Sequence, residues 1–226
     1  MFIPLISMLI VAPLETTPTE AALMETVNPR YVECVTLVET DLEAGRRAAQ
    51  QWVSDGGGAE ARHCLSIADI RAGFPKLAAL RFEEIAQRKD AGDDYVRARL
   101  LAQAVEAWLK AKEPDHAEAA LDLALELVPD SAELQLTAAK VYAAQERWQE
   151  TITAVSRAED DNIVSAETYV LRGRGRYVIG AYERAAEDVV AALTLDPVNV
   201  DALVLRGDLA QVGISIDVFL SAPAQE

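Results

Sequence analysis

The chain has 226 residues, of which 51% are hydrophobic and only 6% aromatic. Its formal net charge of −16 argues against two classes of function. Nucleic-acid binders present a basic surface, and docking on anionic membrane surfaces needs clustered lysine and arginine. Abundant alanine with few aromatic residues suits close helix packing better than strands, so we expect an all-α fold.

The first 27 residues are expected to lie outside the folded part. The apolar run Phe2–Ala12 has the length of a signal-peptide core and is too short to span a bilayer, which takes about 20 residues. No Lys or Arg precedes the run, and Pro13 follows it, which counts against cleavage there. We interpret residues 1–27 as a candidate export signal with a spacer, which implies a periplasmic protein. The alternatives are a mis-assigned start or a short apolar helix in a cytoplasmic protein.

Residues 28–128 are expected to form three helix pairs. Asn28-Pro29 is typical of a helix start, because proline is favoured in the first turn. Asp41 can cap the second helix. The expected helices run from Pro29 to about Glu39, from Asp41 to about Ser54, over Ala59–Ala72, Pro75–Lys89 and Tyr95–Lys112, and from Pro114 to Val128.

The stretch Ala166–Asn199 reads AETYVLRGRGRYVIGAYERAAEDVVAALTLDPVN. It holds two helical patterns, Ala166–Ile179 and Tyr182–Leu195. The motif Val-Leu-Arg-Gly that ends at Gly173 recurs and ends at Gly207, 34 positions later (207 − 173). A 34-residue period of helix–turn–helix is the signature of the tetratricopeptide repeat, and the chain resembles that family.

The resemblance covers about 130 residues closely, and roughly 65 more upstream loosely. It implies a right-handed α-solenoid of stacked antiparallel helix pairs over residues 28–226, with about five pairs of which the last is truncated. After Gly213, only Ile214–Leu220 remains for a final second helix. The stretch YVECVTLVETDLEAGRRAAQQWVSDGGGAEARHC also looks like exported repeat proteins of α-proteobacterial type. The regular units start at Ala98, Ala132, Ala166 and Val200.

The resemblance implies a non-catalytic scaffold or adaptor that binds a peptide or protein segment in a concave groove. The family lines that groove with the second, fifth, ninth, twelfth and thirteenth positions of each unit. The basic residues among these positions suggest an acidic partner segment; the alternative is mixed surface charge that neutralises Glu106, Glu133 and Glu167. A second hypothesis is a self-associating structural protein, a homo-oligomer formed through the apolar C-terminal end. The candidate groove residues are Arg99, Lys110, Leu136, Lys140, Arg174, Tyr177 and Val178.

No group of residues predicts an enzyme or a metal site. His63 and Cys64 are neighbours on a helix, where successive side chains point about 100° apart, so they do not form a nucleophile–base pair. His116 follows Asp115 in the first turn of a helix, which is a solvated position. No CxxC or HxxxH spacing brings zinc ligands together. We therefore expect no catalysis, no metal ion and no cofactor.

Two pairings are expected. In the Arg-Gly variety of this repeat, an acidic residue often stands late in the second helix, so Arg172 is expected to form a structural salt bridge with Asp188. Cys34 and Cys64 lie on the first helices of successive pairs, whose axes are about 8–10 Å apart. That distance allows a disulfide; two buried thiols acting as small hydrophobes are the alternative.

Overall fold

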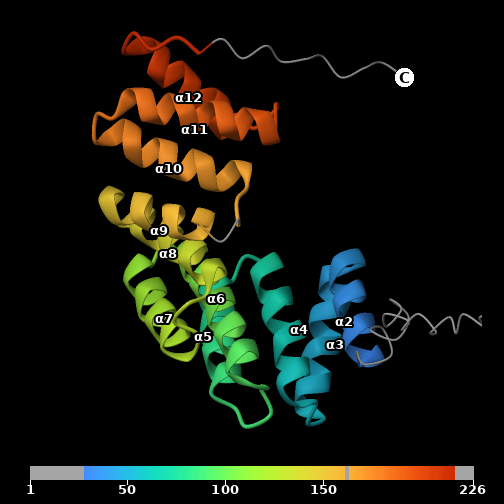
Figure 1. Ribbon diagram of the computed structural model, residues 1–226. Helices are drawn as coiled ribbons and strands as arrows, with labels where there is room; N and C mark the ends of the chain where they lie inside the picture. Colours follow the sequence, from blue (N-terminus) through green and yellow to red (C-terminus); the bar gives the residue numbers. More distant parts are fainter. Residues whose placement is uncertain (1–27, 161–162, 217–226) are drawn as a thin grey trace, which may run out of the picture.

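The computed structural model describes residues 28–160 and 163–216 (Figure 1). Within these ranges the chain forms helices and no strand, which confirms the expected all-α class. The candidate signal segment and residues 217–220 of the apolar C-terminal run lie outside the described residues. The helices are α2 (Pro29–Thr40), α3 (Leu42–Ser54), α4 (Gly58–Arg71), α5 (Pro75–Ala86), α6 (Asp94–Lys110), α7 (Pro114–Leu127), α8 (Ala132–Ala144), α9 (Trp148–Asp160), α10 (Ala166–Val178), α11 (Tyr182–Leu195) and α12 (Val200–Gln211).

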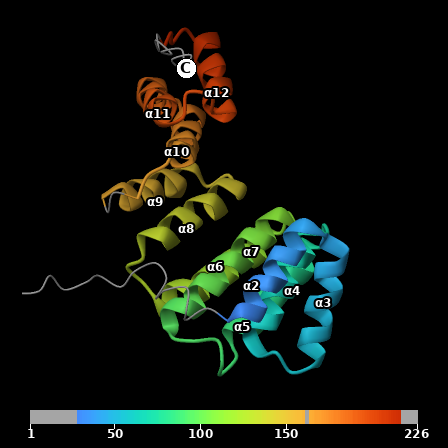
Figure 2. The ribbon, with the colours of Figure 1, turned by 90° about the vertical axis from the view of Figure 1, so that its right-hand side faces the viewer.

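Consecutive helices pack as five pairs, α2/α3, α4/α5, α6/α7, α8/α9 and α10/α11, and α12 follows without a second helix among the described residues. The stack runs from α2 at one end to α12 at the other, as Figures 1 and 2 show. We call α2, α4, α6, α8, α10 and α12 the first helices. Neighbouring first helices contact one another between α2 and α4 and from α6 through α8 and α10 to α12.

Side-chain caps fix where the regular first helices begin. Ser131 accepts a hydrogen bond from the backbone N–H of Leu134 (3.3 Å) at the start of α8, and Asn199 accepts one from Ala202 (2.9 Å) at the start of α12. At α10, Ser165 and Thr168 cap each other's backbone N–H reciprocally. Each cap satisfies an N–H that the helix itself leaves unpaired.

Helix α5 ends at Ala86 and not at Lys89 as its sequence suggests. Arg97, in α6, reaches back and donates to the carbonyl oxygens of Ala86 (3.1 Å) and Arg88 (2.9 Å). A guanidinium that satisfies the last carbonyls of a helix stabilises that end. The contact comes from the next helix, α6, which explains why the local pattern within α5 did not reveal the boundary.

The turn between paired helices needs one residue in the left-handed region. Gly180 holds it between α10 and α11, with φ of +80°. Lys112 and Glu146 hold the equivalent places in the two preceding units, each with φ of 60°. A side chain makes this conformation costly, so these two turns are strained relative to the one at Gly180.

Small residues let the helices cross closely. A Cβ atom on Gly45 would lie 2.6 Å from the Cα atom of Val38, so α2 and α3 can cross at this distance only with glycine. Larger side chains fill the space between crossings, and Trp108, Phe82 and Leu121 are all but fully buried. The buried apolar side chains of the described residues form three clusters, one within α2–α4, one from α5 to α9 and one within α11 and α12.

A buried ion network joins the first two pairs. Asp69, in α4, is completely buried. Its two carboxylate oxygens accept hydrogen bonds from Arg46 Nε in α3 and Arg81 Nε in α5, each at 2.9 Å. Two guanidinium partners satisfy a charge that would be costly to bury alone, so the carboxylate holds three consecutive helices together.

The described residues after α12 turn back onto the solenoid. Ile214 and Ile216 pack against the apolar cluster formed by α11 and α12. Ser215 and Ile216 lie beside α11. None of the helices in the described ranges is long and apolar enough to cross a membrane.

Candidate functional site

The first helices together present one surface, which we call the first-helix face. Side chains on this face contact one another across neighbouring helices. The residues that define it are Tyr31, His63, Gln103, Glu106, Lys140, Glu167, Arg174 and Asp208.

A cleft of about 510 Å³ lies on this face between α2, α4 and α6. Tyr31 and His63 line one side, and Arg99 and Gln103 line the other. Sequence reasoning did not find this cleft, because the helix spacing here departs from the 34-residue step. A cavity of this size falls in the range of ligand-binding pockets.

His63 connects three first helices within the cleft. Its Nδ1 lies 2.8 Å from the hydroxyl of Tyr31, and its Nε2 lies 2.8 Å from Oε1 of Gln103. An amide oxygen can only accept, so Nε2 carries the hydrogen and Nδ1 accepts from the tyrosine hydroxyl. Burial lowers the pKa of His63 and raises the pKa of Tyr31. The pattern supports a neutral imidazole that links α2, α4 and α6.

The central part of the face carries a charge row, formed by Glu106, Lys140, Glu167, Arg174 and Asp208. Lys140 Nζ lies 3.0 Å from Glu106 Oε1 and 3.3 Å from Glu167 Oε1. Arg174 Nη1 lies 2.7 Å from Asp208 Oδ2. Burial alone would lower the pKa of Lys140, but its bonds to the two glutamates outweigh burial and raise it. Both cations are therefore neutralised by carboxylates of neighbouring units.

Arg99 and Lys110 differ from those two cations. Both are exposed on α6, and neither forms an ion pair with another residue in the described ranges. Arg99 lies at the cleft. The expectation of an acidic partner therefore depends on Arg99 and Lys110 and draws no support from Lys140 or Arg174.

Apolar side chains follow the face toward its C-terminal end. We call this set the apolar strip: Leu136 on α8, Val170, Tyr177 and Val178 on α10, and Val204 on α12. Val178 is 51% exposed and Val204 is 50% exposed. Leu136 and Val170 are half-buried, and the ring of Tyr177 rests against that of Tyr182, with centroids 5.5 Å apart. The strip leaves apolar surface uncovered over three successive first helices.

Cys34 and Cys64 form a disulfide between α2 and α4, with Cα atoms 6.3 Å apart. Cys64 is completely buried and Cys34 is nearly so. Cys64 directly follows His63, which lines the cleft, in the sequence. The disulfide therefore holds together the two helices that form one wall of the cleft.

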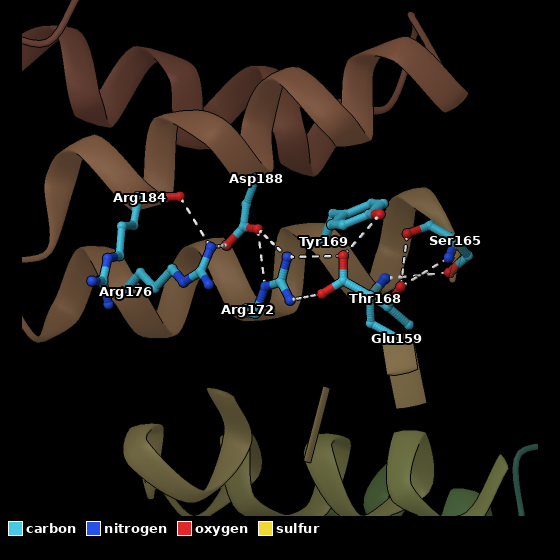
Figure 3. Close-up of polar contacts among 8 residues, drawn as sticks. All are labelled: Glu159, Ser165, Thr168, Tyr169, Arg172, Arg176, Arg184 and Asp188. Atoms are coloured by element: carbon cyan, nitrogen blue, oxygen red, sulfur yellow. Dashed lines mark hydrogen bonds and ion pairs between the residues drawn. The ribbon is translucent and has the colours of Figure 1, made fainter. Parts of the chain in front are cut away.

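Figure 3 shows how Arg172 meets Asp188 inside the α10/α11 pair. Arg172 Nε and Nη2 donate to Asp188 Oδ1 at 3.0 and 2.8 Å. Two further partners were not foreseen: Glu159, in α9, accepts from Arg172, and Arg176 donates to Asp188 Oδ2 at 2.8 Å. Burial opposes ionisation of Arg172, but its bonds to Asp188 and Glu159 raise its pKa. The network joins two successive pairs as well as the two helices of one pair.

The described residues hold no group of three or more His, Cys, Asp or Glu side chains placed to bind a metal ion. What the first-helix face offers is a cleft, a neutralised charge row and uncovered apolar surface. Such a combination suits non-covalent recognition of another chain.

No protein-family model matches the sequence, and no curated protein matches it either. Solved structures do match. A tetratricopeptide repeat protein from Parabacteroides merdae ATCC 43184 superposes with a TM-score of 0.64 at 15% identity, covering 85% of this chain and 77% of that one. YrrB, a TPR protein with an unusual peptide-binding site, superposes with a TM-score of 0.59 at 18% identity, covering 83% of this chain and 96% of that one.

TTC0263, a thermophilic TPR protein of Thermus thermophilus, gives a TM-score of 0.57 at 17% identity, covering 80% of this chain and 97% of that one. Identities this low establish the fold and not the function. The predicted right-handed solenoid of antiparallel helix pairs is confirmed. The chain has the tetratricopeptide-repeat fold.

Proposed function

We propose that the protein is a non-catalytic scaffold that binds a peptide or a segment of another protein along the first-helix face. The observation that carries this proposal is the apolar strip, which aligns uncovered apolar side chains over three successive units. Val178 and Val204 stay about half exposed although the neighbouring interior is closely packed. Aligned apolar surface of this kind marks interaction sites. YrrB, which shares the fold, has an unusual peptide-binding site, and this is consistent with such a use of the solenoid.

The partner segment would be apolar where it meets the strip and acidic where it reaches the cleft. Arg99 is exposed at the cleft, where a carboxylate of the partner can pair with it. Lys140 and Arg174 already have carboxylate partners. These two cations would therefore set the arrangement of neighbouring units rather than capture the partner.

We also propose that the protein is exported to an oxidising compartment such as the periplasm. The disulfide between Cys34 and Cys64 supports this location, because such bonds persist outside the reducing cytosol. A second candidate function is self-association through the C-terminal end. It is favoured by Val198 and Val200, which are 77% and 71% exposed.

Selection of peptides from a displayed random library tests the main proposal. Selected peptides are expected to be apolar with an acidic residue and to bind the oxidised protein in fluorescence anisotropy. The double variant with Val178→Glu and Val204→Glu should bind the selected peptides at least tenfold more weakly. Arg99→Glu should weaken the binding of those peptides that contain an acidic residue. Leu123→Glu is the matched control, since Leu123 is 45% exposed on α7, a second helix.

Equal losses in the strip variant and in the control, or no selected peptide at all, would contradict the proposal. Light scattering separates the two candidate functions. A stable dimer that dissociates on Val198→Glu and Val200→Glu would favour self-association.

A further inference from the structure

Helix α10 meets its second helix, α11, at two adjacent positions. In the α10/α11 pair, these are Arg172 and Gly173, which lie under Ala185 and Asp188 of α11. A Cβ atom on Gly173 would lie 3.1 Å from Asp188 Cβ and 3.5 Å from the carbonyl oxygen of Ala185. Figure 3 shows Asp188 directly above the Arg172 guanidinium. In this pair, the glycine of the Arg-Gly sequence lets the second helix approach closely, and the arginine forms an ion pair with its aspartate.

The two preceding units have a different pair of residues at the positions equivalent to Arg172 and Asp188. Where α10 has Arg172, both earlier first helices have alanine, and where α11 has Asp188, both earlier second helices have alanine. An arginine in the first helix is thus matched by an aspartate in the second, and an alanine by an alanine. The four alanines are Ala104 and Ala138 on the first helices and Ala120 and Ala154 on the second, all buried.

Helix α12 has the same Arg-Gly sequence as α10, but no second helix follows it among the described residues. Arg206 and Gly207 stand 34 positions after Arg172 and Gly173. A Cβ atom on Gly207 would have nothing within 4 Å, and Gly207 is exposed whereas Gly173 is buried. Arg206 is only half-buried. It forms no ion pair with any residue in the described ranges.

We call the uncovered side of α12 the second-helix seat. Its residues correspond to those that α10 turns toward α11. Leu203 and Arg206 are half-buried, and Gly207 and Ala210 are exposed. The seat therefore offers a small-residue crossing point beside a cation that has no carboxylate partner among the described residues.

The sequence that follows α12 lacks the pattern of a second helix. At the 34-residue step, Phe219 stands where α11 has the small Ala185, Ala222 stands where it has Asp188, and Pro223 falls in the helix interior. Proline inside a helix costs about 3 kcal/mol. In the described part of this segment, Ile214 and Ile216 pack against the apolar cluster of α11 and α12, and Ser215 and Ile216 line a pocket together with α11. Residues 214–226 thus do not match the seat.

We propose that the second-helix seat binds an α-helix of another protein, one that presents a small residue to Gly207 and, three positions later, an acidic residue to Arg206. The α10/α11 pair supplies the geometry, because Ala185 and Asp188 have this spacing. A small residue lets the two helices approach closely. The carboxylate pairs with a guanidinium that becomes buried by the contact. This surface is separate from the first-helix face, so the two proposals fail independently.

The probe is a peptide with the sequence of α11, YERAAEDVVAALTL. An isolated helix this short is marginal in water. A staple therefore joins the positions of Glu183 and Glu187, which are exposed in α11. Binding of the labelled peptide to the whole chain is measured by fluorescence anisotropy. Circular dichroism checks that each protein variant keeps its helix content.

We expect saturable binding to the wild-type protein. Arg206→Asp should weaken binding at least tenfold, and a peptide with arginine at the aspartate position should restore affinity to that variant. Gly207→Leu should abolish binding, because its side chain fills the crossing point. Arg71→Asp, at an exposed position on α4, is the control for the change in net charge. Val178→Glu should have no effect, which separates this test from that of the proposed function.

Four results would overturn the inference: no binding of the probe, binding unchanged by Arg206→Asp and Gly207→Leu, no rescue by the reversed charge, or a different occupant. A dimer that Gly207→Leu dissociates would identify a second copy of the chain as the occupant. A tenfold gain in probe affinity on deleting residues 217–226 would identify the chain's own C-terminal segment.

Discussion

Reducing the disulfide between Cys34 and Cys64 should loosen one end of the solenoid and leave the other unchanged. The bond closes a loop with a sequence separation of 30. On the chain-entropy model, a loop of this length stabilises the folded state by about 3–4 kcal/mol. Contacts in a solenoid are made only between neighbouring units. The loss should therefore fall on the terminal pair α2/α3.

The two helices of that pair should respond to different extents. After reduction, α3 is still joined to α4 by the ion pair between Arg46 and Asp69, at 2.9 Å. In contrast, α2 loses its covalent link to α4. A loss of about 3 kcal/mol corresponds to a rise of about a hundredfold in the open population. Amide exchange should therefore accelerate by up to about that factor in α2, less in α3, and not at all in α10 and α11.

Hydrogen exchange read by mass spectrometry, with and without reductant, measures this gradient. The variant with both Cys34→Ala and Cys64→Ala is the control for effects of the reductant itself and should reproduce the pattern without it. Unchanged protection in α2 would refute the reasoning. So would equal acceleration along the whole chain, because it would mean that the solenoid unfolds as one unit.

Three other predictions concern stability in urea. Arg172→Ala and Asp188→Ala should each destabilise by about 2 kcal/mol, and the double variant by less than their sum, because each single change leaves the other buried charge with only one of its two partners, Arg176 for Asp188 and Glu159 for Arg172; additive losses would contradict this. Burial lowers the pKa of His63, so the unfolded chain takes up its proton first as pH falls below about 6.5. The wild type should then lose more stability from pH 7.5 to 5.5 than His63→Gln, and parallel curves would exclude this role. Lys112→Gly and Glu146→Gly should each stabilise by about 0.5–1 kcal/mol, because glycine adopts their left-handed backbone without strain; a loss of stability would show that their side chains matter more.

Much of the fold could be predicted because its signals are local. Pro29 and Asp41 mark helix starts through backbone chemistry that acts within one turn. The repeat of the motif at Gly173 and Gly207 gives the period directly. Positions that follow this period, such as Lys140 and Arg174, could be assigned to one face of the solenoid from their numbering alone.

The features that were missed depend on contacts between distant residues. His63 links Tyr31 to Gln103 at separations that do not follow the 34-residue step. Glu159 reaches Arg172 from the preceding pair. Which acid meets which cation depends on how successive pairs rotate against each other. Local patterns do not contain that rotation where the spacing is irregular.

The charge row also gives the solenoid an elastic response to its surroundings. Lys140 and Arg174 each connect a first helix to the next one, so both pull on the same side of the stack. Partly exposed pairs of this kind contribute about 0–1 kcal/mol, and salt screens exposed charges over about 8 Å at physiological ionic strength. When a stack of repeats bends, each interface between neighbouring repeats changes only slightly, at a small cost in free energy. Added salt should therefore loosen the contacts between first helices along the charge row, while the disulfide between Cys34 and Cys64 holds α2 and α4 together at any ionic strength.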